Sequence, residues 1–186
     1  MKLPIRKYGD PILRAKGKRV EKVDEHIRSL AADMLETMHE ANGVGLAAQQ
    51  VGHALQLTVV DISQVEDRPS NLKLNGDDKD PASAMPLVLL NPKLSLADET
   101  VSGNEGCLSF PDITAEIDRA VSITLEAETL EGDAVRIEAA GLLSRVLQHE
   151  VDHLNGILFV DRMSSVAKAS HASRLKRLQK ETVKGM

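Results

Sequence analysis

The sequence predicts an α+β fold, in which mainly antiparallel sheets pack around a central helix, with one further helix near each end of the chain. Two observations favour this fold. Helical and strand-like patterns occur in the order helix, several strands, helix, rather than in regular alternation. The chain has 186 residues, of which 42% are hydrophobic and 27% charged, as in globular proteins with one core. We therefore expect a single domain over residues 1–186.

The first expected helix spans about residues 24–41. Its apolar residues recur at helical spacing and form one hydrophobic face: Ile27, Leu30, Ala31, Met34, Leu35 and Met38. Asp24 is suited to cap the first turn, and Asn42-Gly43 is suited to end the helix. After a glycine-rich stretch, the run LQLTVVDI (55–62) predicts a buried strand.

Residues 63–86 are polar and rich in Pro, Asp and Ser. A structureless loop of this length is uncommon in a compact domain, so we expect a mobile surface insertion. It is not expected to be a domain boundary, because the segments on both sides look like neighbouring strands of one sheet. Four further segments are strand-like, and a turn at residues 131–133 joins the last two: residues 86–96, 99–109, 120–130 and 134–140.

The second helix is expected from about Leu142 to Asn155, between Gly141 and Gly156. Apolar residues cover most of its circumference, which is typical of a buried central helix. A weaker pattern predicts a last helix over about residues 165–180, within a basic tail that extends over residues 165–186.

The charge is unevenly distributed along the chain. The net charge is −5, yet residues 162–186 hold seven Lys or Arg and only one acidic residue, Glu181. The acidic body argues against general nucleic-acid binding, and we expect no DNA partner. The basic tail suggests contact with something anionic, and a solvated basic helix face explains it equally well.

The N-terminal residues do not resemble a signal peptide, and no stretch is long and apolar enough to cross a membrane. The single cysteine, Cys107, has no partner for an intrachain disulfide, which fits a reducing compartment. We expect a cytoplasmic protein without a membrane partner, and nothing in the sequence demands more than a monomer.

The central helix carries a possible half of a metal site. His149 and His153 stand four residues apart, and Glu150 follows the first histidine. On a helix this spacing places both rings on one face, one turn apart. Core histidines satisfied by hydrogen bonds are the simpler explanation for one histidine alone. The full pattern His-Glu-x-x-His favours a metal site, because it supplies two ligands and a base.

A catalytic site of this type needs a third protein ligand and one open coordination position. One large protease group places a third histidine six residues after the second, where this chain has Phe159. Another group uses a downstream glutamate, and only Glu181 in the basic tail is available here. The remaining histidines are expected to be surface or core residues: His26, His39, His53 and His171.

Cys107 is the better candidate for the third ligand. It lies in the segment NEGCLSFP (104–111), where Gly106 allows close approach of the backbone. A lone cysteine is usually a small buried hydrophobic residue. Beside a two-histidine helix that lacks its third ligand, metal ligation becomes the better interpretation. The prediction is a Cys-His-His site with one open position.

The chain contains three motifs in the order GVGLAAQQ (43–50), EGCLS (105–109) and QHEVDH (148–153). Together and in this order, they resemble the motifs of the peptide deformylase family. The resemblance extends from the N-terminus to about residue 165. It implies a hydrolase that removes the formyl group from the N-terminal formylmethionine of new polypeptides. It also implies one divalent metal ion, expected to be Fe²⁺, which Zn²⁺, Ni²⁺ or Co²⁺ can replace.

The resemblance also implies roles for particular residues. The implied metal ligands are Cys107, His149 and His153. Glu150 is implied as the general acid and base, which takes a proton from the attacking water and returns one to the leaving amine. Gln50 and the backbone N–H of Leu108 are implied as the groups that stabilise the oxyanion.

The substrate is expected to lie along Gly43-Val44-Gly45, which would form an open edge to which the peptide adds as a strand. A pocket for the methionine side chain needs apolar walls. The candidates are Val44, Leu142 and Val146.

Two other features concern the surroundings of the site. Glu105 and Arg119 are expected to form a supporting ion pair. Arg145, one turn before His149, either lines the rim of the pocket or extends outward into solvent.

Two other functions fit parts of the pattern. A zinc endopeptidase would keep its metal without Cys107 and would cleave internal peptide bonds. A non-enzymatic metal-binding protein would need a fourth ligand, such as Glu105 or Glu150, and no open position. A further hypothesis is that the basic tail contacts the ribosome, where new polypeptides emerge.

Overall fold

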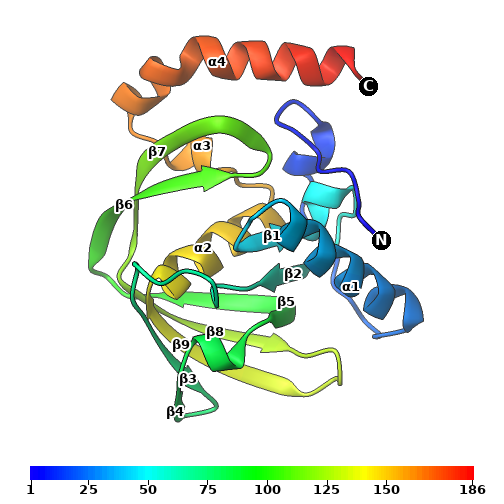
Figure 1. The fold of residues 1–186 in the computed structure, drawn as a ribbon, viewed down its shortest axis with the longest axis vertical. Helices are drawn as coiled ribbons and strands as arrows, with labels where there is room; N and C mark the ends of the chain where they lie inside the picture. Colours follow the sequence, from blue (N-terminus) through cyan, green and yellow to red (C-terminus); the bar gives the residue numbers. More distant parts are fainter.

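A seven-stranded antiparallel sheet forms one layer of the structure, a computed structural model that describes residues 1–186 (Figure 1). The strand order is β1-β2-β5-β8-β9-β3-β4, so β1 is an edge strand that pairs only with β2. The strands are β1 Gly45–Ala47, β2 Leu57–Val60, β3 Ser70–Leu74, β4 Asp77–Lys79, β5 Leu87–Leu96, β8 Ser122–Glu128 and β9 Ala134–Gly141.

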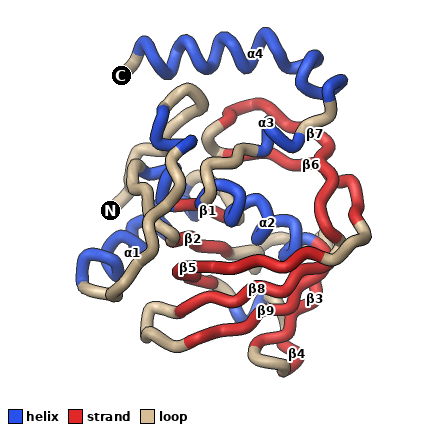
Figure 2. Tube along the Cα trace, turned by 180° about the vertical axis from the view of Figure 1, so that it is seen from behind, coloured by secondary structure: helices blue, strands red, loops and turns tan.

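A separate two-stranded ribbon consists of β6 (Thr100–Cys107) and β7 (Phe110–Ala120). The central helix α2 (Leu142–Leu154) lies between this ribbon and the sheet (Figure 2). It contacts β1, β2, β3, β5 and β9 on one side and β7 on the other. The pairing of the ribbon shifts register between Gly106 and Cys107, where β6 turns back into β7.

Helix α2 is central because its side chains are buried on nearly every side. Twelve of its thirteen residues are buried. Leu143 and Leu147 join a hydrophobic cluster that includes Leu125 and Ile137 from the sheet. Burying one such side chain contributes about 1.5–3 kcal/mol, so packing rather than helix propensity holds α2 in place. The predicted α+β fold with a buried central helix is confirmed.

Helix α1 (Glu25–Glu40) covers β1 and β2 with the apolar face that the sequence predicts. The side chain of Asp24 caps it by accepting a hydrogen bond of 2.9 Å from the backbone N–H of Ile27. The chain also has a short helix α3 (Phe159–Arg162) and three 3₁₀ helices, Pro11–Arg14, Ala48–Val51 and Ala82–Ala84.

Helix α4 (Ser165–Lys184) lies across β7 on the outside of the ribbon, as Figures 1 and 2 both show. It is longer than the predicted 165–180, and it begins where the Ser164 side chain accepts a hydrogen bond from the N–H of Ala167. Only Leu175 is buried, so the hydrophobic pattern in the sequence is weak. None of the helices combines the length and the hydropathy that a membrane span requires.

The expectation for residues 63–86 was wrong in one respect. We expected a mobile insertion, but the segment contains β3 and β4, which extend the sheet beyond β9. In β3 only Leu72 is fully buried, and Leu74 is partly buried against the same hydrophobic cluster. Backbone pairing with β9 holds this strand, and two apolar residues are too few for a clear alternating pattern in the sequence. The flanking strands β2 and β5 are direct neighbours, as expected.

Candidate metal centre

Cys107, His149 and His153 converge between the ribbon and α2. Their donor atoms all lie within 4.8 Å of one another. The two Nε2 atoms of His149 and His153 are 3.2 Å apart, and Sγ of Cys107 lies 3.3 Å from Nε2 of His153. The helix supplies two donors one turn apart, and the end of β6 supplies the third from more than forty residues earlier in the chain.

The spacing of these atoms fits a bound metal ion. Metal–nitrogen bonds of about 2.0–2.1 Å at tetrahedral angles place two nitrogens about 3.3–3.4 Å apart, close to the observed separation. Nδ1 of His149 lies 2.9 Å from Oε1 of Glu105, which favours the tautomer with a proton on Nδ1 and a free lone pair on Nε2. Nδ1 of His153 is buried and has no hydrogen-bond partner. The ring of His153 is therefore not explained as a core histidine satisfied by hydrogen bonds.

The group contains three protein donors and no fourth. The carboxylate of Glu105 is already held by Arg119, Arg145 and His149, and Glu150 is not part of the converging set. The closed four-ligand site of a non-enzymatic protein is therefore not supported. Three ligands beside a cavity are the arrangement of a catalytic metal site.

Glu150 lies beside this group and is almost completely buried. One of its carboxylate oxygens, Oε2, has no hydrogen-bond partner. The other lies so close to β1 that a Cβ atom on Gly45 would be only 2.6 Å from it. Burial raises the pKa of Glu150 to about 7, partly offset by the neighbouring His149. A carboxyl group with a pKa near the working pH is suited to both accept and donate a proton.

Gln50 is buried, and its side-chain amide is fixed in orientation. Oε1 accepts a hydrogen bond of 3.0 Å from the N–H of Ala47, and Nε2 donates to Oγ of Ser109 at 3.1 Å. The same Nε2 lies 3.7 Å from Sγ of Cys107, so its N–H groups face the metal ligands. The 3₁₀ helix Ala48–Val51 places the side chain there, between β1 and the ribbon.

Leu108 occupies the turn between β6 and β7. Its backbone carbonyl accepts a hydrogen bond of 2.9 Å from Lys7, while its backbone N–H donates none within the chain. An unused donor next to Cys107 is available to a substrate oxygen.

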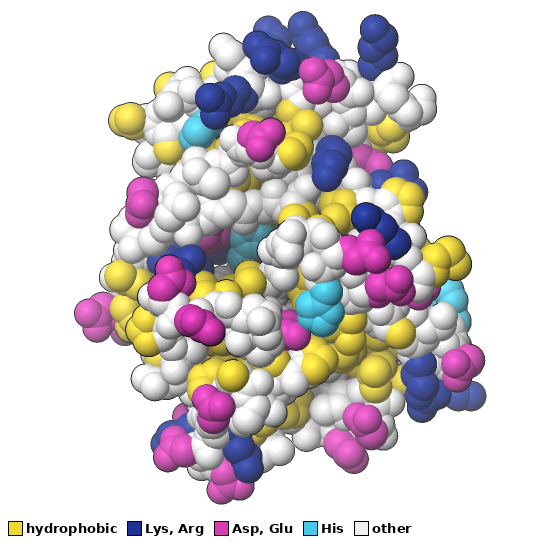
Figure 3. Space-filling model, in the orientation of Figure 1, with side chains coloured by type: hydrophobic (Ala, Val, Ile, Leu, Met, Phe, Trp, Pro, Cys, Tyr) yellow, Lys and Arg dark blue, Asp and Glu magenta, His cyan; other side chains and the backbone are white.

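A cavity of about 500 Å³ is lined by two of the candidate ligands, Cys107 and His149. Figure 3 shows it as a hollow in the surface, with histidine atoms at its floor. It is lined by every residue that we predicted to contact substrate: Gly43, Val44, Gly45, Leu142 and Val146. Gln50, Cys107, Leu108, His149 and Glu150 also line it, whereas His153 does not.

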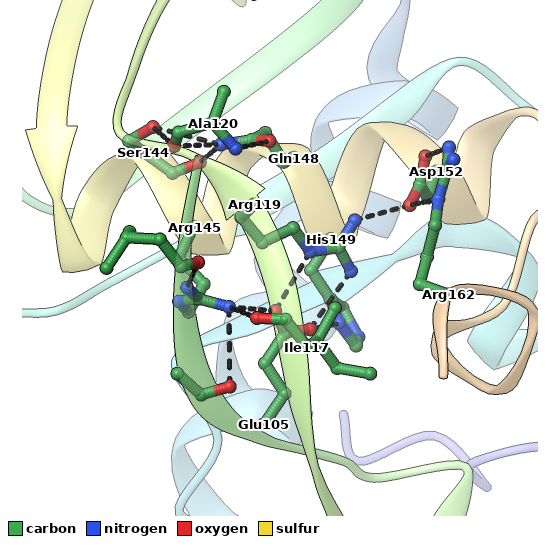
Figure 4. Close-up of polar contacts among 12 residues, drawn as sticks. Glu105, Ile117, Arg119, Ala120, Ser144, Arg145, Gln148, His149, Asp152 and Arg162 are labelled. Atoms are coloured by element: carbon green, nitrogen blue, oxygen red, sulfur yellow. Dashed lines mark hydrogen bonds and ion pairs between the residues drawn. The ribbon is translucent and has the colours of Figure 1, made fainter. Parts of the chain in front are cut away.

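Glu105 is the centre of a buried ionic network beside the metal ligands (Figure 4). Arg119 donates to both of its oxygens at 2.9 and 3.0 Å, which is the expected ion pair. Burial by itself would raise the pKa of Glu105, but the hydrogen bonds with His149 and Arg119 outweigh it and lower the pKa to about 2. Glu105 therefore stays ionised. Beyond Arg119 the network continues to Asp152, which Arg162 also contacts.

Of the two interpretations offered for Arg145 from the sequence, the structure supports the first, because Arg145 is among the residues that line the cavity. It does not extend outward into solvent, because its side chain is buried and its guanidinium donates to Glu105 at 2.8 Å. Its other acceptors are backbone carbonyls of the ribbon. Asp152, Arg162 and Ser109 also support the site and were not predicted. Their only signal in the sequence is proximity to the metal-ligand motifs.

Comparison with known proteins gives one consistent family. The family model described as polypeptide deformylase matches residues 2–169. The peptide deformylase of Acinetobacter baumannii is 43% identical over 180 residues, which cover 96% of this chain and 93% of that protein. That of Dictyoglomus turgidum is 45% identical over 162 residues, which cover 87% of this chain and 93% of that protein.

Solved structures agree with the sequence matches. A plant peptide deformylase superposes with a TM-score of 0.85 at 37% identity, covering 99% of this chain and 92% of that one. The peptide deformylase of Thermus thermophilus gives a TM-score of 0.82 at 38% identity, covering 97% and 99% of the two chains.

Proposed function

The chain belongs to the peptide deformylase family, and from this membership we propose that Cys107, His149 and His153 hold the metal ion with which it works. The enzyme is a metal-dependent hydrolase that removes the N-formyl group from nascent polypeptides. The observation that carries the proposal is the convergence of one sulfur and two nitrogen donors on a cavity that also contains Glu150.

The reaction adds water to the formyl carbon and breaks the bond between that carbon and the amine nitrogen, so that formate and a free amine leave. A bound divalent metal supplies Lewis-acid chemistry, which makes water nucleophilic near neutral pH. Glu150 takes the proton that the attacking water loses and then delivers a proton to the amine nitrogen as the carbon–nitrogen bond breaks. Its buried carboxylate with one unpartnered oxygen is suited to this exchange.

The formyl oxygen gains negative charge as water adds. We assign its stabilisation to the side-chain N–H of Gln50 that does not donate to Ser109 and to the backbone N–H of Leu108. The amide of Gln50 is held by Ala47 and Ser109, so it does not need to reorganise during the reaction.

The peptide is proposed to bind along β1. This strand is at the edge of the sheet, and apart from the N–H of Ala47, which donates to Gln50, its backbone groups on the side away from β2 can pair with an extended chain. Gly43 and Val44 precede it and line the same cavity. The methionine side chain would then enter the apolar part of the cavity, between Val44, Leu142 and Val146.

We infer Fe²⁺ as the metal in the cell, with Zn²⁺, Ni²⁺ or Co²⁺ able to occupy the same ligands. The donor set supports a transition metal, because thiolate and imidazole are poor ligands for Mg²⁺ and Ca²⁺. We also propose a cytoplasmic enzyme that works at the ribosome. The basic residues of α4 are exposed, and Figure 3 shows them gathered along this helix: Lys168, Arg174, Lys176, Arg177, Lys180 and Lys184.

Formate release tests the proposal. The protein, purified without oxygen, is incubated with a formyl-Met peptide and with an unformylated peptide of the same sequence. Formate from the first and no internal cleavage of either is the expected result. Loss of bound metal and of activity in Cys107→Ala supports the ligand set. A Cys107→Ala variant that keeps both its metal and its activity would show that the ligand assignment is wrong.

A further inference from the structure

The metal ligands belong to two pieces of the fold that are not joined by strand pairing. Cys107 ends β6, and β6 pairs only with β7. His149 and His153 are on α2. The distance between the sulfur and the two nitrogens therefore depends on how the ribbon is held against the helix.

Arg145 makes that connection. It projects from α2 one turn before His149 and donates to both strands of the ribbon. Its Nη2 donates to the carbonyl of Val101 in β6 at 2.8 Å, and its Nη1 donates to the carbonyl of Ile117 in β7 at 2.7 Å. Figure 4 shows the side chain reaching from the helix to the strands.

The same guanidinium also holds the residue that orients His149. Nη1 of Arg145 donates to Oε2 of Glu105 at 2.8 Å, and Oε1 of Glu105 contacts Nδ1 of His149 at 2.9 Å. Glu105 is two residues before Cys107 on the same strand. Arg145 is therefore linked to Cys107 along β6 and to His149 through Glu105.

The ribbon is shaped to receive this side chain. A Cβ atom on Gly103 would lie 2.9 Å from the guanidinium of Arg145, although the backbone of Gly103 is not in a conformation that requires glycine. A planar guanidinium can serve acceptors on two strands at once, which a lysine ammonium on one flexible stem cannot do in the same geometry. Other side chains also connect the ribbon to α2: Ser144 and Gln148 bind backbone groups of Ala120 at the end of β7, and Arg119 of β7 pairs with Asp152 of α2. Among the residues of α2, Arg145 is the one that donates to backbone carbonyls of both strands.

We propose that Arg145 is a positioning residue of the metal site, which fastens the β6–β7 ribbon to α2 and so sets the place of Cys107 relative to the two histidines. This inference rests on the proposed ligand set. Arg145 also borders the substrate cavity, but its donors at both terminal nitrogens are engaged within the chain, so it acts through Glu105 and the ribbon.

The test measures metal binding in Arg145→Met, Arg145→Lys and Gly103→Ala. The dissociation constant for Co²⁺ is obtained by competition with a coloured chelator, and the thiolate-to-cobalt absorption band reports the bond to Cys107. Removing groups that orient metal ligands weakens metal binding by about 10–100-fold, and we expect this loss for Arg145→Met. The Co²⁺ affinity of Arg145→Lys should lie between those of Arg145→Met and the unchanged protein. The thiolate-to-cobalt band should shift in both variants.

Gly103→Ala keeps Arg145 and Glu105 and only displaces the guanidinium, so it remains informative if Arg145→Met does not fold. It should weaken Co²⁺ binding in the same direction. Arg136→Met removes an exposed arginine that pairs with Glu126 on the sheet, and it should leave binding unchanged.

Folding is checked in every variant by circular dichroism and thermal unfolding. A folded Arg145→Met or Gly103→Ala protein with unchanged Co²⁺ affinity and an unchanged band would overturn the positioning role, even if its melting temperature were lower. The failure of the ligand set itself looks different: the unchanged protein would then show no thiolate band, or the band would persist in Cys107→Ser.

Discussion

The carboxylate of Glu105 and the ring of His149 meet at 2.9 Å, through Oε1 and Nδ1. This contact selects which nitrogen of His149 faces Cys107 and His153. Because Arg119 and Arg145 hold the same carboxylate, the orientation of His149, a proposed metal ligand, depends on two buried arginines.

Glu105→Gln tests how much this ionic network contributes to the stability of the fold. The amide oxygen can still accept from His149, but the negative charge between the arginines is lost. Leaving a buried charge without its partner costs about 3–5 kcal/mol, so we expect a loss of this size in the free energy of urea unfolding. Glu116→Gln, on an exposed position of β7, is the matched control and should cost less than about 0.5 kcal/mol. Equal stability of both variants would contradict the network.

Glu150→Gln separates proton transfer from metal binding. The glutamine has the same shape and cannot carry the proton, so turnover should fall by about 10²–10⁴-fold while the metal content stays unchanged. Formate release and metal analysis on the same sample decide the outcome. Loss of metal in Glu150→Gln would instead indicate that Glu150 is a metal ligand. Near-normal turnover would show that Glu150 is not the proton-transfer group.

Gln50→Ala tests the oxyanion assignment. Removing one such donor lowers kcat by about 10²–10³-fold, and we expect this loss with metal content preserved. Because Gln50 also braces Ala47 and Ser109, thermal unfolding is measured in parallel. If kcat falls less than about fivefold in a folded, metal-loaded protein, the oxyanion is stabilised elsewhere.

The pair between Arg14 and Asp161 gives a pH dependence. Burial would raise the pKa of Asp161, but the hydrogen bond from Arg14 outweighs it, and the folded-state pKa lies below the ordinary value of 3.8. A depressed pKa contributes stability above pH 3.8, and this contribution is lost as the pH falls through the folded-state value. The melting temperature of Asp161→Asn should therefore lie below that of the unchanged protein at pH 7, and the gap should narrow below pH 3.8. A gap that is constant down to pH 3 would contradict this.

Replacing Lys176, Lys180 and Lys184 by Glu tests the ribosome proposal. All three are exposed on α4, so the helix and the buried Leu175 are left in place. Less of the variant should sediment with ribosomes, and its ribosome binding should depend less steeply on salt concentration. Its activity on formyl peptides should be retained. The same change at Lys22, Lys73 and Lys79 on the body is the control for net charge. Equal ribosome binding by both triple variants would reject the proposal.

Much of the fold could be predicted from the sequence, because the relevant signals are local. Helix α1 was expected over 24–41 and spans Glu25–Glu40, and α2 was expected over 142–155 and spans Leu142–Leu154. In both, apolar residues at helical spacing and recognisable ends determine the bounds. Strand β3 was missed because it has only two apolar residues, Leu72 and Leu74, within a polar segment, which is too short a pattern to detect.

The metal ligands and Glu150 could be proposed because residue type and spacing constrain the chemistry of such a site. Arg145 could not be placed in the same way. Its partners are a carboxylate and backbone carbonyls of β6 and β7, which are 28 to 44 residues away in the sequence. Backbone carbonyls exist at every position and leave no trace in residue identity, so only the folded arrangement reveals them.

The division of the donors between ribbon and helix has a thermodynamic consequence. A cation held by both pieces acts as a cross-link, so occupancy and folding form one linked equilibrium. Free metal at about 100 times its dissociation constant adds about 2.7 kcal/mol to the folded state. If Cys107 holds the metal as proposed, oxidation of its thiol would remove a ligand and the cross-link in a single event.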